Sequence, residues 1–449
     1  MRWSAAALST PALLVSAASA QLSLQTATIV DDGLWNNPSS VGVDADGVVH
    51  VAFMKQFDTD SDSKEIWYGN NAAGGGGAST DFTFVNVTNN SVREEYPSLV
   101  LDADGNVHLA FHTATPGSNK IVYTTNAGGV DVFDFGPIVD ITGSGYIITN
   151  HDVGPDGSVH FVFYTQGSLG AADVFYRRMD ADGTLGPLTP VGATPGVDEV
   201  DPDVAVGPDG TVHIVYNEGF FGGPLVYVND AGGSFAPVPT GVGGSVVFPL
   251  VGTDSDGRVT INYRSTNDAL FLVDQQAPGG AFGEPVQLTP AGTFRPTGRD
   301  RFAYGPDDLR YFVFAANVGV PSSVWLVAEE EPGAFSDPIL VREETPGVIE
   351  TAWSASVAVG PTGLLAATYS LGYYDSASDT VIAPLELATA QLTEPCAADF
   401  DGDGEASVND LLGYLGAFRA GDAAADTDGD GSIDVNDLLA FLGAFRAGC

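Results

Sequence analysis

The chain has 449 residues and a formal net charge of −42, because 58 acidic side chains outnumber 16 basic ones. Such a charge repels a phosphate backbone and argues against nucleic-acid binding, whereas a saline medium would screen it. A hydrophobic content of 44% excludes an intrinsically disordered acidic protein and allows a large packed core.

The first twenty residues have the pattern of a secretory signal peptide. Arg2 precedes an apolar run at residues 5–15, and residues 18–20 form an A-x-A cleavage site before Gln21. The run is too short to cross a membrane, and no other apolar stretch is long enough. We therefore expect a secreted or cell-surface protein without a transmembrane segment.

One sequence motif recurs along residues 21–392. It consists of an apolar strand, a turn that is most often Asp-Gly, and a second apolar strand. The reference positions of its seven copies are His50, His108, His160, His213, Thr260, Tyr311 and Ala366. The spacing varies from 47 residues (His213 to Thr260) to 58 residues (His50 to His108), which is the period of a four-stranded β-propeller blade.

Each copy can be divided into four strands. An Asp-Gly pair between apolar runs predicts a tight hairpin, since glycine accepts a positive φ. Third strands are expected at residues 120–125, 225–228 and 323–327, and an outer fourth strand follows, as at 235–239. The first two strands are almost wholly apolar, as expected when neighbouring sheets cover both faces.

The number of strands predicts how the ring closes. After the seventh copy only a third strand is expected, near residues 381–387. The missing fourth strand can come from residues 24–30, which would join both chain ends in one blade and protect its edges. We predict an all-β, seven-bladed β-propeller at residues 21–392, with six or eight blades as alternatives, and a linker at 393–395.

This region resembles the sialidase-like (BNR-type) repeat propellers of exported bacterial proteins. The Ser-x-Asp-x-Gly-x-Thr-Trp turn of sialidases is absent from the sequence, and their arginine triad cannot be assigned. The resemblance therefore implies a fold and not an activity.

The loops expected at one mouth of the propeller are rich in aromatic and basic side chains. Before the first strands these are Trp35, Arg93, Tyr96, His151, Arg295, Arg299, Arg301 and Trp353. After the second strands they are His112, Tyr164, Asn217, Phe220, Phe221, Arg264, Tyr373 and Tyr374. Arginines pair with carboxylates or sulfates and rings stack on sugars, so this face could bind an anionic polysaccharide. Alternatively, the rings plug the channel and the arginines pair with nearby acids.

Whether the propeller is an enzyme stays open at this stage. Propellers that resemble ulvan-type lyases use His or Tyr to remove a proton beside a uronate carboxylate, which Arg neutralises. His112, Tyr164 and Arg264 share the second-strand exit on three blades and are candidates for such a polysaccharide lyase. A glycoside hydrolase would need a pair of carboxylates, and no pair stands out among 58 acidic residues.

The four in-register histidines and the Asp-Gly turns admit a metal-binding interpretation. A propeller would place the histidines on separate blades, and three of the seven copies lack one. We therefore expect His50, His108, His160 and His213 to be structural. The turns lack an acidic residue at a twelfth position and are expected to serve only as turns.

The C-terminal segment, residues 396–449, contains one acidic loop pattern twice, 27 residues apart (Asp399 to Asp426). Oxygen-bearing side chains stand at loop positions 1, 3, 5, 9 and 12, with glycine at 6 and a backbone carbonyl available at 7, as calcium requires. The candidate ligands are Asp399, Asp401, Asp403, Glu405, Ser407, Asp410, Asp426, Asp428, Asp430, Ser432, Asp434 and Asp437. The duplication predicts two bound Ca²⁺ ions.

A short amphipathic helix is expected after each loop. In the first, Leu411, Leu412, Leu415 and Phe418 are expected to share one face. This EF-hand-like unit of loop then helix resembles the dockerin family, whose duplicated calcium units dock onto cohesin modules of scaffold or cell-surface proteins. The resemblance covers residues 396–449 and implies a small all-α module with a cohesin-like partner.

Dockerins recognise their partners through loop positions 10 and 11. These positions are Val408 and Asn409 in the first copy, and Val435 and Asn436 in the second. Well-known cellulosomal dockerins have a Ser/Thr pair at these positions, and this chain does not. The partner is therefore expected to differ from a standard cohesin.

Cys396 and Cys449 are the only cysteines and bracket the module. In an exported protein we interpret them as a disulfide, worth up to ~4 kcal/mol through loop closure. Two free thiols are the alternative. Dockerins with such a bracket and a Gly-Cys end resemble a distinct subgroup.

Three functions follow from the sequence. The first is an exported propeller that binds a polysaccharide or a protein and is tethered by the dockerin-like module. The second is a polysaccharide-degrading lyase or glycoside hydrolase that is anchored in the same way. The third is a structural cell-surface protein.

Overall fold

The computed structural model describes two compact units, residues 24–391 and a C-terminal unit that contains residues 392–449. The described residues are 22–56, 64–115, 117–167, 170–290, 296–297, 302–316, 322–345, 350–352, 355–376, 380–392, 398, 400, 407–420, 425, 427 and 433–447. Within them no helix is both long and apolar enough to cross a membrane.

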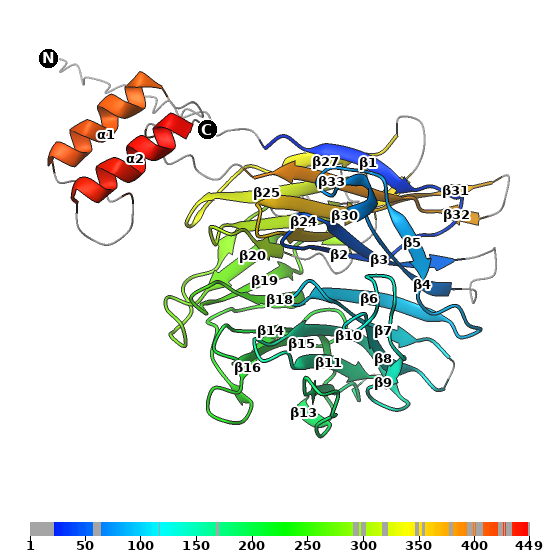
Figure 1. Ribbon diagram of the computed structural model, residues 1–449. Coiled ribbons are helices and arrows are strands. Elements are labelled where there is room, and N and C mark those ends of the chain that lie inside the picture. Colours follow the sequence, from blue (N-terminus) through cyan, green and yellow to red (C-terminus); the bar gives the residue numbers. More distant parts are fainter. Residues whose placement is uncertain are drawn as a thin grey trace, which may run out of the picture. The chain divides into compact units, whose positions relative to one another are not determined.

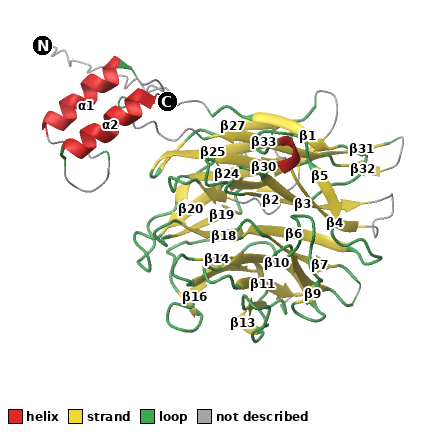
Figure 2. Cartoon of the chain, in the orientation of Figure 1, coloured by secondary structure: helices red, strands yellow, loops and turns green. Residues whose placement is uncertain are grey.

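The larger unit is almost wholly β, and most of its antiparallel sheets have four strands (Figures 1 and 2). The first sheet contains β2 (Ser39–Val43), β3 (Val49–Gln56), β4 (Lys64–Asn70) and β5 (Thr83–Asn86). The second contains β6 (Glu94–Leu101), β7 (Val107–Thr113), β8 (Lys120–Thr125) and β9 (Val139–Asp140). The third contains β10 (Tyr146–Val153), β11 (Val159–Thr165), β12 (Val174–Met179) and β13 (Thr189–Gly192).

The next three sheets keep this strand order, but the fourth strands of two of them are short and the sixth sheet has additional strands. The fourth has β14 (Glu199–Val206), β15 (Val212–Glu218), β16 (Leu225–Asn229) and β17 (Ala236–Pro237). The fifth has β18 (Val246–Thr253), β19 (Val259–Ser265), β20 (Leu270–Asp274) and β21 (Val286–Gln287). The sixth has β22 (Pro296–Thr297), β23 (Phe302–Tyr304), β24 (Arg310–Ala316), β25 (Ser323–Glu331), β26 (Ala334–Phe335) and β27 (Ile339–Glu343).

The seventh sheet joins the two ends of this unit. It contains β29 (Ser356–Val359), β30 (Leu364–Tyr369), β33 (Leu385–Gln391) and the N-terminal strand β1 (Gln25–Val30). Gln25 pairs with Thr389 and Ala27 with Leu387, which is the closure that the strand count predicts. The third strand lies four residues later than predicted, because an extra sheet precedes it: β28 (Glu350–Ala352), β31 (Leu371–Asp375) and β32 (Thr380–Ile382).

The first strands of the sheets form a closed ring. β2 contacts β6, and the contacts continue through β10, β14 and β18; β23 contacts β29, which returns to β2. Between the fifth and sixth sheets the approach is close at Gly252, where a Cβ atom would meet Phe302 at 2.8 Å. This ring of antiparallel sheets, seven among the described residues, is the arrangement of a β-propeller.

The four repeated histidines hold the second and third strands of the first four sheets together. Each Nδ1 lies within hydrogen-bond distance of a third-strand tyrosine hydroxyl; the pairs are His50–Tyr68 (2.7 Å), His108–Tyr123 (2.6 Å), His160–Tyr176 (2.8 Å) and His213–Tyr227 (2.7 Å). In the first two sheets Nε2 faces the turn aspartate, at 3.1 Å from Asp44 and 3.3 Å from Asp102. The histidines are therefore structural, as expected.

The C-terminal unit contains two helices, α1 (Val408–Ala420) and α2 (Val435–Ala447). The rings of Tyr414 and Phe441 stack with their centroids 3.9 Å apart, and Leu411 and Phe418 pack beside them. The expected face of α1 was partly wrong, because Leu412 and Leu415 are 64% and 40% exposed. The core stripe follows positions 411, 414 and 418, and both of these leucines lie outside it.

Candidate functional site

The first strands of the second to fifth sheets share a β-bulge close to where each strand begins. One residue there has a positive φ: Tyr96 (55°), Ile148 (50°), Asp201 (53°) or Phe248 (50°). The pairing register with the second strand shifts at the same point. Positive φ is unfavourable for such side chains, so its fourfold repetition indicates a built-in device that redirects a side chain.

We call this end of the sheets the mouth; it is where first strands begin and second strands end. His112, Tyr164, Asn217 and Arg264 stand here at one register position, opposite Glu95, Ile147, Val200 and Val247. Each bulge residue directly follows one of those partners. The predicted second-strand residues therefore share one end of neighbouring sheets.

The three candidate catalytic residues lie in separate surroundings at the mouth. His112 stacks on Tyr96 with ring centroids 5.3 Å apart and an interplanar angle of 15°. Tyr164 meets Phe220 edge to face at 6.3 Å. The guanidinium carbon of Arg264 lies 5.2 Å from the centroid of the Phe248 ring. Each of the three residues thus stands on a different sheet and has an aromatic neighbour of its own.

The most concentrated charge at the mouth surrounds Glu95, a carboxylate that the sequence analysis missed. Its Oε1 accepts hydrogen bonds from Lys64 Nζ (2.8 Å), Arg93 Nε (2.8 Å) and Arg93 Nη2 (2.5 Å), and Oε2 lies 3.6 Å from His112 Nε2. Burial alone would raise the pKa of Glu95, but contacts with His112, Lys64 and Arg93 hold it well below its usual range. Arg93, Tyr96 and His112 are thereby brought together.

Exposed aromatic rings in the described part of the chain are confined to the predicted loop set. Tyr96 is 41% exposed, Phe221 88% and Tyr374 59%. Tyr96 lies in β6, Phe221 follows β15, and Tyr374 lies in β31, in the segment that follows β30. Large exposed rings at one end of a ring of sheets are typical of a binding surface.

Among the described residues, the buried polar atoms at the mouth without a hydrogen-bond partner include His112 Nδ1 and Asn217 Oδ1. The residues occupy the same register position on the second and fourth sheets and are 4% and 0% exposed. Buried polar atoms of this kind are normally satisfied by water or by a ligand. They mark places where a bound molecule or ordered water would gain a hydrogen bond.

A buried glutamate at the start of a first strand is a repeated structural element rather than a catalytic acid. Glu94 accepts from Asn90 Nδ2 (3.0 Å), Glu199 from the Thr194 amide (2.8 Å) and Glu350 from the Thr345 amide (2.6 Å). Burial, assisted by the charge of Glu65, raises the pKa of Glu94 to about 7. All three glutamates accept from a residue four or five positions earlier, through a side-chain amide at Glu94 and a backbone amide at Glu199 and Glu350, so we assign them to loop anchoring.

The remaining predicted mouth residues fall into two groups. Trp35 Nε1 donates to the Asn37 carbonyl (2.5 Å), and Trp35 bridges to Ala383. His151 lies inside β10, 2% exposed, between Ser98 Oγ (3.1 Å) and the His108 carbonyl (3.3 Å), and so is a core residue rather than part of a binding loop. Tyr373 lies in β31 and pairs with Glu350 and Ile382. Four predicted residues lie outside the described residues: Arg295, Arg299, Arg301 and Trp353.

The described part of the C-terminal loops shows how each helix begins. Asp410 Oδ2 accepts the Ser407 amide and Asp437 Oδ2 accepts the Asp434 amide, both at 2.7 Å. Ser407 Oγ and Asp434 Oδ1 in turn accept the amides of Asn409 and Asn436, so these contacts cap the starts of α1 and α2. Asp410 and Asp437 are fully buried, and such oxygen donors suit a hard cation such as Ca²⁺.

Most of the predicted calcium and disulfide residues cannot be placed. Outside the described residues lie Cys396, Asp399, Asp401, Asp403, Glu405, Asp426, Asp428, Asp430, Ser432 and Cys449. Among the described residues no group of three or more His, Cys, Asp or Glu side chains is arranged to hold a metal. The calcium sites and the disulfide remain predictions.

Comparison with known proteins gave only distant structural similarities. No family model and no curated protein matched the chain. A phage phi92 endosialidase shares 11% identity and a TM-score of 0.47 over 83% of this chain and 70% of its own. A protein of unknown function from Dyadobacter fermentans shares 12% identity and a TM-score of 0.46 over 82% of this chain and 99% of its own.

A Trypanosoma rangeli sialidase, solved with the inhibitor DANA, shares 11% identity and a TM-score of 0.44. The match covers 86% of this chain but only 58% of the sialidase. At these identities and TM-scores no activity or residue role is transferred to this chain.

Proposed function

We propose that this chain is an exported seven-bladed β-propeller that binds an anionic polysaccharide at its mouth. We further propose that residues 396–449 form a calcium-dependent dockerin-like module, which tethers the propeller to a cohesin-like or cell-surface partner. The observation that carries the first proposal is the contact group of Lys64, Arg93, Glu95, Tyr96 and His112.

The composition of this group suits an acidic sugar. Lys64 and Arg93 share one carboxylate, Glu95, so the group keeps a surplus positive charge even when His112 is neutral. The Tyr96 ring is exposed beside it and can stack on a sugar ring. In a protein of net charge −42, a local surplus of positive charge beside an exposed ring favours a uronate or sulfate ester.

The same geometry favours binding over catalysis. A general base must reach the proton that it removes. His112 is 4% exposed and lies against Tyr96, with Nε2 directed at Glu95. Tyr164 and Arg264 stand on two other sheets and have aromatic neighbours of their own.

For the tether, the helices of the C-terminal unit offer two matched apolar stripes. In α1 the residues are Val408, Leu412 and Leu415, 64%, 64% and 40% exposed; in α2 they are Val435, Leu439 and Leu442, 61%, 62% and 39% exposed. Both stripes follow i, i+4 and i+7 and include the predicted recognition positions Val408 and Val435. Apolar residues in that number on a small surface support docking to a protein partner.

The test of the polysaccharide proposal uses affinity gel electrophoresis of the full chain in gels that contain alginate, dextran sulfate or neutral dextran. We expect retardation by the two anionic polymers and none by dextran. Arg93→Ala and Tyr96→Ala should each weaken retardation at least fivefold. Arg178→Ala is the matched control, because Arg178 is also exposed and paired with carboxylates, Asp156 and Asp180, at the opposite end of its strand.

Retention of full binding by both mouth variants would contradict the proposed site. Absence of retardation by either anionic polymer would contradict the ligand class. The same mixtures are followed at the absorbance of unsaturated uronate, and appearance of that product would establish a lyase in place of a binding protein.

A further inference from the structure

The contact between the fifth and sixth sheets departs from the repeat. In the first four sheets, a second-strand histidine and a third-strand tyrosine fill the space beside the following sheet. Thr260 stands at the histidine position of the fifth sheet. Leu272 stands at the tyrosine position, since it pairs with Asn262 as Tyr227 pairs with Val215. Two polar rings are thus replaced by two smaller side chains.

A cavity of about 380 Å³ lies at this contact. Thr260, Asp274 and Gln275 line it from the fifth sheet, and Tyr304, Arg310 and Glu329 from the sixth. Asp254, Asp307 and Asp308 also border the cavity. They lie in the turns between first and second strands, so the cavity is at the end of the sheets opposite the mouth. Its volume is within the usual range for small-molecule sites.

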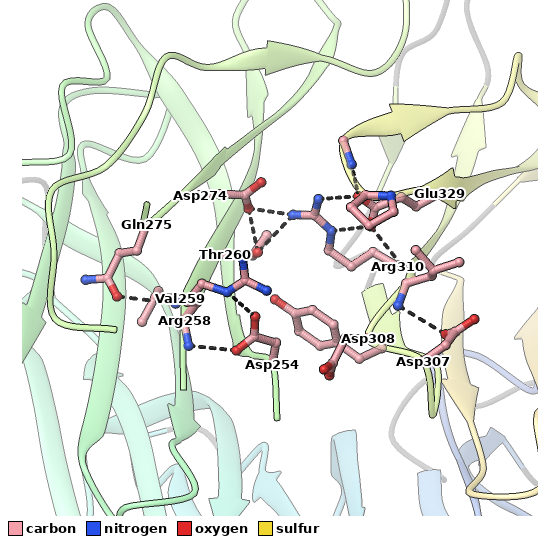
Figure 3. A pocket seen from close by; sticks show the side chains of 14 residues that line it. Asp254, Arg258, Val259, Thr260, Asp274, Gln275, Asp307, Asp308, Arg310 and Glu329 are labelled. Carbon is pink, nitrogen blue, oxygen red and sulfur yellow. Dashed lines mark hydrogen bonds and ion pairs between the residues drawn. The ribbon is translucent and has the colours of Figure 1, made fainter. Parts of the chain in front are cut away.

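Buried Arg310 joins the two sides of the cavity wall through its hydrogen bonds. At the same position of the second strand, the other six sheets have an apolar residue. Arg310 is 6% exposed and donates to both oxygens of Glu329, from Nε and Nη2 at 2.7 Å each. Nη1 donates to Asp274 Oδ1 (2.5 Å) and to Thr260 Oγ1 (3.0 Å). Figure 3 shows Arg310 between Glu329 on one side and Asp274 and Thr260 on the other.

A second guanidinium replaces the missing histidine at the turn. Asp254 corresponds to Asp44 and Asp102, which face the histidines of their own sheets. In the fifth sheet it instead accepts from Arg258 Nε at 2.6 Å (Figure 3). The lining therefore alternates carboxylates and guanidiniums, which hold one another in fixed positions.

We propose that this cavity, here named the inter-sheet pocket, binds a neutral polyol the size of one sugar residue. A hydroxyl group both donates and accepts, so it can donate to a carboxylate such as Asp274 and accept from a neighbouring guanidinium. An anionic ligand would meet five carboxylates in the lining. An ammonium ion would have to compete with Arg258 and Arg310, which already pair with Asp254, Asp274 and Glu329. The inter-sheet pocket shares no residue with the contact group at the mouth and does not depend on the function proposed for it.

The test is saturation-transfer NMR of the full chain with D-glucose, D-galactose and glycerol. D-glucosamine and D-galacturonate serve as charged counterparts of the same size. We expect saturation transfer to at least one of the two neutral sugars and weaker transfer to both charged sugars. The comparison is made in the Arg93→Ala variant, because the mouth proposed above would itself bind D-galacturonate. Stronger transfer to either charged sugar from that variant, or none to any sugar at 20 mM, would overturn the proposal.

Thr260→His distinguishes this pocket from any other sugar site. It places in the fifth sheet the side chain that four other sheets accommodate beside an equivalent aspartate, and it occupies the pocket with protein atoms. Saturation transfer should fall at least tenfold, while retardation by alginate at the mouth should not change.

Asp274→Asn is the second variant and keeps the shape of the wall, so it tests the chemistry if Thr260→His fails to fold. The half-exposed Asp274 carboxylate is a stronger acceptor than an amide, and we expect saturation transfer to fall about threefold or more. Unchanged transfer in a folded variant of either kind would overturn the assignment to this pocket.

Discussion

The propeller and the C-terminal unit use the same residue type, aspartate, at different depths. In the propeller, Asp102 accepts from two backbone amides, from the Asn106 side chain and from His108, so the sheet itself satisfies its charge. In the C-terminal unit Asp410 and Asp437 are fully buried beside a small core formed around Tyr414 and Phe441. Backbone amides also donate to Asp410 and Asp437, but full burial keeps water from both carboxylates. We therefore predict that the C-terminal unit depends on a bound cation and that the propeller does not.

Removal of calcium would sharpen this comparison most. We expect a chelator to abolish the helical circular-dichroism signal of the C-terminal unit and to leave the propeller unfolding transition in place. Asp410→Asn with Asp437→Asn should have the same effect, and Asp102→Asn should not. Helicity that survives chelation would remove the basis for the calcium assignment.

Arg310→Met should produce the largest effect within the propeller. Glu329 is 3% exposed and would be left as a buried charge without its guanidinium partner, which costs roughly 3–5 kcal/mol. The free energy of unfolding of the propeller, from urea titration, measures the loss. Arg178→Ala is the control, because its partners are half-exposed and such pairs contribute at most about 1 kcal/mol. Equal losses would mean that Arg310 is no more than a surface ion pair.

Acid should weaken the propeller through its buried histidines. Burial lowers the pKa of His108, His160 and His213, that of His160 from 6.5 to about 4 with help from the charge of Arg178. The unfolded chain therefore takes up these protons first, and stability falls as pH decreases from 6.5 toward 4. His160 alone contributes at most about 3 kcal/mol.

Glu94 acts in the opposite direction over part of this range, because burial raises its pKa to about 7 and its contribution decreases as pH rises from 4.5 to 7. Urea titrations at pH 7.5 and pH 4.5 would show the net effect. A propeller that is equally stable at both values, in wild type and in a His160→Gln variant, would contradict the histidine contribution.

Tyr96→Gly should have the smallest effect on stability and a large effect on binding. Glycine adopts φ of 55° without strain, so we expect a change within about 1 kcal/mol in the free energy of unfolding. Retardation by alginate should nevertheless be lost together with the exposed ring. If stability falls by several kcal/mol instead, Tyr96 belongs to the core and not to a binding surface.

Most of the fold could be predicted from the repeated sequence motif. Asp-Gly turns such as Asp104-Gly105 recur with apolar strands on both sides, and Gly105 has a φ of 79°; these local signals locate the hairpins directly. The structural role of His108 could also be predicted, because a side chain repeated on separate sheets cannot assemble into one site.

The candidate binding groups were harder to predict because they depend on strand pairing and on contacts between sheets. The bulge at Tyr96 depends on pairing with β7, and the link from Lys64 to Glu95 joins two sheets. Arg310 departs visibly from an apolar position, which is a signal that the sequence did carry. The exposed side of α1 was misjudged at Leu412, since packing against α2 and not periodicity alone decides which stripe is buried.

The pairing of β1 with β33 has a consequence for the order in which the protein folds. Gln25 and Thr389 are partners, so the first strand of this unit must wait for its last strand before the hydrogen bonds between them can form. Contacts between such distant residues slow folding. The outer edge of β33 therefore stays uncovered until the N-terminal strand docks, and removal of residues from either end of this unit would open the same sheet.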